Sequence, residues 1–137
     1  LTNQFNFIKK TMDDIESMRN RPMYYHRDGT PYEGPNAVFQ WVKDRSDYSK
    51  KIVKQDRVGR FRISTVWLGL DHGFGFGPPL IFESMVFDQR KKSVHIFYGK
   101  KYEYAPDIEM QRYSSLDDAL AGHGELCKRF KKKKKKK

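Results

Sequence analysis

Residues 60–87 read RFRISTVWLGLDHGFGFGPPLIFESMVF, which is an apolar run, a segment rich in glycine and proline, and a second apolar run. From residue 61 to 65 apolar and polar side chains alternate, which places them on opposite faces of a strand. Over 66–70 and again over 80–87 both sets are mostly apolar, a pattern typical of a strand covered on both faces. The sequence therefore predicts that the two runs pair as the central hairpin of one sheet.

The connecting segment 71–79, DHGFGFGPP, is predicted to be a wide hairpin loop. Its three glycines allow positive φ, and its two prolines stop strand pairing. A phosphate-binding glycine loop is excluded, because such a loop opens a helix whereas a strand follows here. Phe74 and Phe76 either fold back as plugs or stand exposed as a protein-binding surface.

The strings STVWLGLDHGFGFGPPLIFESMVF and QRYSSLDDALAGH, within residues 60–87 and 109–124, resemble the motifs of small uncharacterised proteins of tailed phages and prophages. The resemblance implies a phage context, and with it the cytoplasm of a host cell. It implies no activity and no site residues. Residues 1–59 and the lysine tail lie outside it.

A length of 137 residues indicates one domain that is long enough to bury a core. The net charge is +11, and the lysines of 131–137 supply seven of these charges, which leaves +4 for the rest. Because adjacent lysines repel one another, 131–137 is predicted to be a disordered tail. It is either an arm that binds polyanions or an addition at the gene boundary.

Several classes of protein are excluded by composition. The chain has no apolar run long enough to span a membrane and no secretion signal. The single Cys127 excludes an internal disulfide and a cysteine-rich zinc cluster, and it fits a reducing compartment. We therefore expect a cytoplasmic protein with no cofactor, no bound metal and no membrane partner.

The remaining elements flank the hairpin. We expect a helix over 5–19, within an N-terminal extension of residues 1–20, and we expect it to pack on the single domain of 21–130 rather than on a partner. A second helix, opening at Pro35, is expected to cover one side of the sheet. Further strands are predicted at 23–26, 52–58, 93–104 with a bend at 99–101, and 108–113.

The last helix is predicted to begin after Ser115, whose side chain can cap it. An apolar stripe is expected at Leu116, Leu120, His123 and Cys127, widened by Ala119 and Leu126. The glycines at 122 and 124 predict close packing against a neighbour. The resulting fold class is α+β, an antiparallel meander of about five strands with two or three packed helices.

Two kinds of site are possible. An enzyme, a metal- or histidine-dependent hydrolase or nuclease, would use Asp71, His72, Glu83 and His123. No spacing matches a known catalytic motif, so this is the alternative. Nucleic-acid binding would use basic side chains that neutralise phosphates, interleaved with Tyr98, Tyr102 and Tyr104. The basic residues are Arg57, Arg60, Arg62, Arg90, Lys91, Lys92, Lys100 and Lys101.

The expected function is that of a phage-type accessory protein without catalytic activity, which acts by binding host machinery. The partner would be a host or defence protein, or a nucleoprotein complex, so that RNA or DNA is contacted by the basic face. Phe74 and Phe76, or the first helix, would supply contacts to protein.

Overall fold

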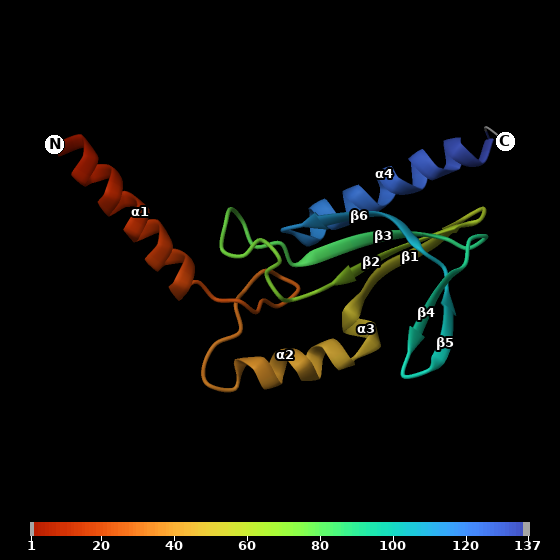
Figure 1. Cartoon of the computed structure of the whole chain (residues 1–137), viewed down its shortest axis with the longest axis horizontal. Helices are drawn as coiled ribbons and strands as arrows, with labels where there is room; N and C mark the ends of the chain where they lie inside the picture. Colours follow the sequence, from red (N-terminus) through yellow and green to blue (C-terminus); the bar gives the residue numbers. More distant parts are fainter. Residues whose placement is uncertain (1, 136–137) are drawn as a thin grey trace.

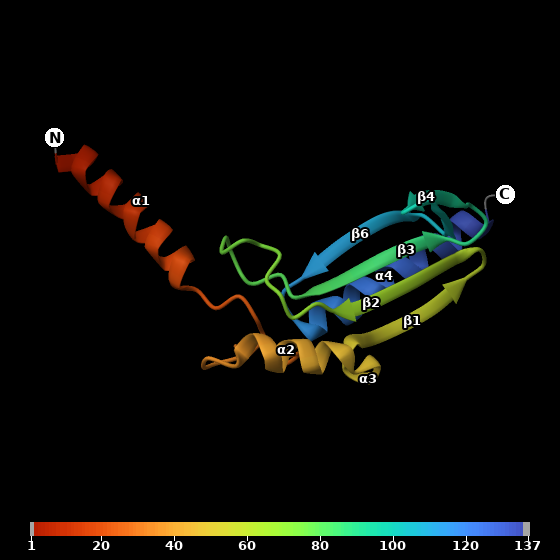
Figure 2. The same cartoon turned by 60° about the horizontal axis from the view of Figure 1, so that its bottom comes forward.

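The computed structural model describes residues 2–135, with side chains described except at positions 2, 14, 17–20 and 134–135. These residues form an α+β fold with a four-stranded antiparallel sheet of order β1-β2-β3-β6 and a separate hairpin, β4-β5 (Figures 1 and 2). The elements are α1 (Thr2–Asn20), α2 (Ala37–Ser46), α3 (Tyr48–Lys51), β1 (Ile52–Val58), β2 (Phe61–Trp67), β3 (Phe82–Asp88), β4 (Ser93–Phe97), β5 (Lys100–Tyr104), β6 (Asp107–Tyr113) and α4 (Leu116–Lys135).

The central hairpin is confirmed. β2 and β3 pair without a register shift, from Phe61 opposite Asp88 to Trp67 opposite Phe82. β1 adds to the outer side of β2 and β6 to the outer side of β3. The two apolar runs therefore form the middle of the sheet, as their alternation indicates.

One face of this sheet is covered by α4, which contacts all four of its strands (Figure 2). The side chain of Ser115 caps the helix as predicted, because its Oγ accepts from the backbone N–H of Asp118 at 3.1 Å. The side chains that α4 buries are Ala119, His123, Leu126 and Phe130. Leu120 is predicted for the apolar stripe but is 42% exposed. The residues of α4 that face the sheet belong to the neighbouring row of the helix, which contains Ala119 and His123. α4 also continues through Lys135, so much of the predicted disordered tail is helical, and residues 136–137 lie outside the described residues.

The prediction that the second helix covers one side of the sheet is wrong. α2 instead lies against the end of β2, where the indole N–H of Trp41 donates to the carbonyl of Leu68 at 3.0 Å and Arg45 donates to that of Trp67 at 2.9 Å. Gly69 makes this packing possible, since a Cβ there would collide with the rings of Trp41 and Trp67. Among the described helices, only the one-turn α3 lies beside the second face of the sheet, where it contacts β1 and β2.

The strand predicted over 93–104 is two strands. β4 and β5 form a hairpin that pairs from Ser93 opposite Tyr104 to Phe97 opposite Lys100. Tyr98 and Gly99 turn the chain with φ of 50° and 73°, and two consecutive positive φ values are typical of a tight hairpin turn. Figure 1 shows the hairpin below the sheet, on the side opposite α4.

The first helix is confirmed, but the prediction that it packs on the domain is wrong. α1 stands away from the sheet (Figure 1), and the apolar side chains described on it, Phe5, Phe7, Ile8, Met12 and Ile15, are exposed. The physical reason lies at its end, where the guanidinium of Arg21 donates to the carbonyls of Gly75 and Gly77 and so fixes the exit of the chain on the glycine loop. Pro22 then prevents the helix from continuing toward the sheet.

Gly122 and Gly124 provide a matched test of how closely α4 packs. A Cβ at Gly122 would collide with the ring of Tyr113 in β6, whereas a Cβ at Gly124 meets nothing within 4 Å. Gly122→Ala is expected to destabilise the fold by about 1–3 kcal/mol, because the overpacked ring must move. Gly124→Ala is expected to stabilise it by up to about 1 kcal/mol through helix propensity. Urea unfolding of both variants checks this, and equal shifts of the same sign would contradict it.

Candidate nucleic-acid interface

The glycine loop of 71–79 is held in place by hydrogen bonds and an ion pair of the buried Asp71 side chain. The buried carboxylate of Asp71 accepts from two backbone N–H groups of the loop, those of Gly73 at 2.7 Å and Leu80 at 2.9 Å. Its other oxygen lies 3.4 Å from the guanidinium of Arg21, which also holds two loop carbonyls. These contacts use both oxygens of Asp71 to hold the loop, which is a structural role. Phe74 and Phe76 are 81% and 68% exposed at its surface. Of the two predicted arrangements, the side chains therefore stand exposed and do not fold back as plugs.

The four residues named as an alternative catalytic set do not come together. His72 bonds through Nδ1 to the carbonyl of Leu70. Glu83 forms an ion pair with Arg112 at 3.0 Å, while His123 lies under α4 on the opposite side of the sheet. The expected Asp71–His72 site is therefore not assembled with either of the other two groups.

His123 is instead the centre of a buried polar chain between α4 and the sheet. Its Nδ1 lies 2.7 Å from Oγ1 of Thr65, which lies 2.5 Å from Oγ of Ser84. Its Nε2 lies 2.7 Å from Oδ2 of Asp56 in β1, and the thiol of Cys127 approaches the same oxygen at 4.0 Å. Burial, reinforced by the carboxylate, raises the pKa of that thiol.

Sequence reasoning missed Asp56 as the partner of His123. The two residues are far apart in the chain, and Asp56 belongs to a strand with many charged side chains. One signal was present: Asp56 alternates with Arg57, so the two point to opposite faces, and only one of those faces is toward a helix.

The face of the sheet that α4 does not cover carries arginine and aromatic side chains. We call it the uncovered face. Arg57 and Arg62 lie directly opposite each other on β1 and β2, and Arg62 lies opposite Phe87 on β3. The guanidinium carbon of Arg62 is 4.3 Å from the centroid of the Phe87 ring, a cation–π contact. A row of two positive charges and one ring thus crosses three strands.

A hollow of about 270 Å³ opens on this face beside α3. Polar and aromatic side chains at its wall are Tyr48, Lys51, Gln55, Arg62, Ser64 and Phe87. The amide of Gln55 donates to Oγ of Ser64 at 3.1 Å, and the ring of Tyr48 is exposed. The hollow therefore brings together hydrogen-bonding groups and two aromatic side chains, and neither Tyr48 nor Phe87 is among the residues that the sequence predicts for a site.

Further basic residues gather at one end of the sheet, which we call the basic end. The backbone N–H of Gln89 donates to the carbonyl of Arg60 at 2.7 Å, which brings the β1–β2 and β3–β4 turns together. Arg90, Lys91 and Lys92 are exposed there. The ring of Phe130 packs on Phe61 with centroids 4.7 Å apart, so the lysines that follow Phe130 begin at the same end (Figure 1).

Three of the residues predicted to bind nucleic acid, Arg60, Lys100 and Lys101, lie outside the exposed surface of the basic end. Arg60 forms an ion pair with the buried carboxylate of Asp88 at 3.1 Å and is held inside the turn. Lys100 and Lys101 begin β5 at the tip of the hairpin, away from the β3–β4 turn. The tyrosines at 98, 102 and 104 lie on that hairpin too, with exposed rings.

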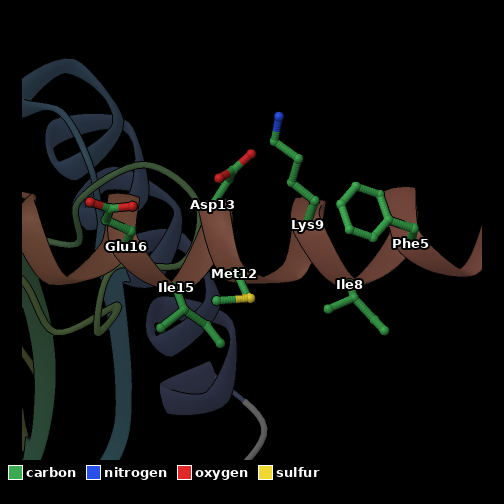
Figure 3. Close-up of a pocket in the computed structure, with 7 residues that line it drawn as sticks. All are labelled: Phe5, Ile8, Lys9, Met12, Asp13, Ile15 and Glu16. Atoms are coloured by element: carbon green, nitrogen blue, oxygen red, sulfur yellow. The ribbon is translucent and has the colours of Figure 1, made fainter.

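The apolar side of α1 forms a second exposed surface. Figure 3 shows Ile8, Met12 and Ile15 on one side of the helix, with Asp13 and Glu16 on the adjacent side. The three apolar side chains are each about half exposed or more. No other described element contacts this helix.

Comparison of the chain with family models, with curated proteins and with solved structures gave no match. Among the helices of residues 2–135, none combines the length and the low polarity that crossing a bilayer requires.

Thr65→Val tests the buried chain. Valine keeps the shape of threonine but leaves Nδ1 of His123 and the hydroxyl of Ser84 without their partner, which is expected to cost about 1–3 kcal/mol of unfolding free energy. Asp56→Asn, at a half-exposed position, keeps an acceptor and is expected to cost less. Chemical denaturation measures both, and a Thr65→Val variant as stable as the parent would show that the chain does not stabilise the fold.

Proposed function

We propose that this protein is a non-enzymatic accessory protein that acts by binding, and that its uncovered face binds a single strand of nucleic acid, alone or within a nucleoprotein complex. The observation that supports this most directly is the row of Arg57, Arg62 and Phe87 on the sheet face opposite α4, beside which only the one-turn α3 lies among the described helices.

Electrostatics favours an anion over this row. Arg57 and Arg62 are a cross-strand pair of like charges, and among the described residues neither has a carboxylate within 4 Å. Like charges directly opposite each other destabilise a sheet. A phosphate bound between them relieves that repulsion and releases counterions from the nucleic acid.

The neighbouring hollow suits an unpaired base. The exposed ring of Tyr48 offers a face for stacking, and the Phe87 ring is paired with the guanidinium of Arg62 beside it. Stacking on aromatic side chains is the general way in which proteins hold unpaired bases. Gln55 is exposed at the same hollow and donates to the buried hydroxyl of Ser64, which leaves its amide oxygen as an acceptor for a base. A duplex would present only its stacked edges to this face, so a single strand fits better.

The basic end continues the positively charged surface of the uncovered face toward one end of the sheet. Arg90 and Lys91 lie beyond the Arg57–Arg62 pair at the end of the sheet, and the lysines after Phe130 follow. The tail is thus an auxiliary, sequence-independent contact to phosphates. The phage context indicated by the sequence resemblance remains a prediction, as does a host or defence complex as the target.

Charge variants on the uncovered face test this function. In a chain that ends at residue 130, Arg57→Gln with Arg62→Gln is expected to weaken binding to a mixed-sequence single-stranded oligonucleotide. It should also reduce the slope of log K against log salt by about 1.4, because two phosphate contacts are lost. Tyr48→Ala is expected to cost about 1–3 kcal/mol of binding free energy through lost stacking. Fluorescence anisotropy at several salt concentrations measures both effects.

Lys9→Gln with Lys10→Gln is the matched control, because it removes the same charge from α1. Its affinity should equal that of the parent. If the chain ending at residue 130 does not bind, or if the control loses as much affinity as the arginine variant, the uncovered face is not the interface.

A protein partner for α1 is the second candidate, favoured by its exposed apolar side. Ile8, Met12 and Ile15 follow the spacing with which an amphipathic helix enters an apolar groove. Lys9, Asp13 and Glu16 flank this stripe, so the groove it fits is apolar with polar residues at its rim (Figure 3). α1 and the nucleic-acid surface are then separate contacts to one complex.

Substitutions in α1 separate the two contacts. Ile8→Ser with Met12→Ser is expected to abolish capture of a nuclease-resistant protein partner from host lysate while leaving oligonucleotide affinity unchanged. Lys9→Ser with Lys10→Ser should keep both. Light scattering of the purified chain tests whether the groove belongs to a second copy. A monomer whose captured proteins are all released by nuclease would contradict a protein contact through α1.

A further inference from the structure

We infer that Asp56, His123 and Cys127 form a binding site for one zinc-class divalent cation, at the junction of α4 with the edge strand β1. This site is independent of the uncovered face, which lies on the other side of the sheet. It is the one group of three potential ligand residues found among the described residues whose donor atoms converge within 4.8 Å.

The arrangement follows from the elements that carry the ligands. His123 and Cys127 are four residues apart on α4, so they lie one turn apart on the same side of the helix. Asp56 reaches them from β1, and both Nε2 of His123 and the thiol point at its Oδ2, at 2.7 Å and 4.0 Å. One nitrogen, one oxygen and one sulfur donor thus lie within 4.8 Å of one another, close enough to share one ion.

The donor set selects the class of ion. Imidazole, carboxylate and thiolate together suit borderline ions such as Zn²⁺ and Co²⁺, whereas Mg²⁺ and Ca²⁺ prefer oxygen alone. A thiolate and a carboxylate also neutralise the charge of a divalent ion. Three protein ligands leave a fourth tetrahedral position for water.

The second ring nitrogen of His123, Nδ1, has a hydrogen-bond partner, as the second nitrogen of a metal-bound histidine usually does. Its Nδ1 bonds to the hydroxyl of Thr65, which bonds in turn to Ser84, and all three side chains are buried. When Nδ1–H donates to Thr65, Nε2 keeps its lone pair for a metal. Such a partner fixes the tautomer and the orientation of the ring.

Binding requires small and balanced changes. The cation takes the place of the proton shared between Nε2 and Asp56, and the neutral imidazole then carries its proton on Nδ1. The Cys127 thiol loses its proton to solvent, so one proton is released for each ion. Tetrahedral zinc places nitrogen and oxygen ligands about 3.3 Å apart, so Oδ2 must move outward by a few tenths of an ångström. The side chain of Asp56 is 44% exposed and has room to do this.

Titration of the metal-free, reduced full-length protein with Co²⁺ tests the site. A thiolate-to-cobalt absorption band is expected to rise to saturation at one equivalent and to disappear when Zn²⁺ is added. Cys127→Ser should abolish the band, and Asp56→Asn should weaken binding at least tenfold. Thermal unfolding with Zn²⁺ gives a second readout, since the ion should raise the Tm of the parent but not of Cys127→Ser.

His72→Ala and His95→Ala are controls, because each removes an imidazole outside the site. Both should bind Co²⁺ and Zn²⁺ like the parent. Absence of a thiolate band in the folded parent would show that Asp56 and His123 are only a hydrogen-bonded pair. Zn²⁺ stabilisation that survives Cys127→Ser and Asp56→Asn, but is lost in either control, would place the ion elsewhere. Either outcome overturns the inference.

Discussion

The structure depends on the packing of α4 across one face of the sheet, at the point where His123 meets Thr65. Apolar contacts surround this point on both sides, with Trp67, Phe82 and Ala119 toward one end and Phe61, Leu126 and Phe130 toward the other. The polar chain between them fixes the register of the helix, because His123 can reach Thr65 and Asp56 together from one position only. Buried polar groups that are all paired give such specificity at the cost of leaving a severe penalty if one partner is lost.

A single covering helix has a direct consequence for function. A four-stranded antiparallel sheet with one face buried leaves the other for solvent or for a ligand. In this protein that face is not simply polar, since it combines Arg57, Arg62 and Phe87 with an adjacent hollow. The β4–β5 hairpin lies on the same side of the sheet, opposite α4 (Figure 1). All but one of its residues are exposed, so it contributes little to the core.

The sequence predicted what depends on local alternation and missed what depends on distant contacts. The runs on either side of Asp71–Pro79 were correctly paired because their period and their loop left one arrangement. At the Tyr98–Gly99 turn the sequence predicts only a bend, since tyrosine at positive φ is uncommon and gives no signal. For α1, helical spacing correctly indicated an apolar side but could not show that the domain leaves it uncovered.

The candidate sites show the same division. Arg57 and Arg62 were named from charge alone, and the register places them together. Asp56 was not named, because its role depends on a helix far along the chain. The pairing of Arg60 with Asp88 could likewise not be read from either residue, since Arg60 lies in the β1–β2 turn and Asp88 at the end of β3, and only the folded sheet brings these two segments together.

Mapping of backbone amide shifts by NMR, with a single-stranded oligonucleotide added to the chain ending at residue 130, tests the central claim most directly. The account predicts shifts concentrated on the outward-facing residues of β1, β2 and β3 and on the turn at 89–92, with α4 unchanged. Shifts confined to α4 or to the glycine loop, with β1–β3 silent at saturation, would contradict it.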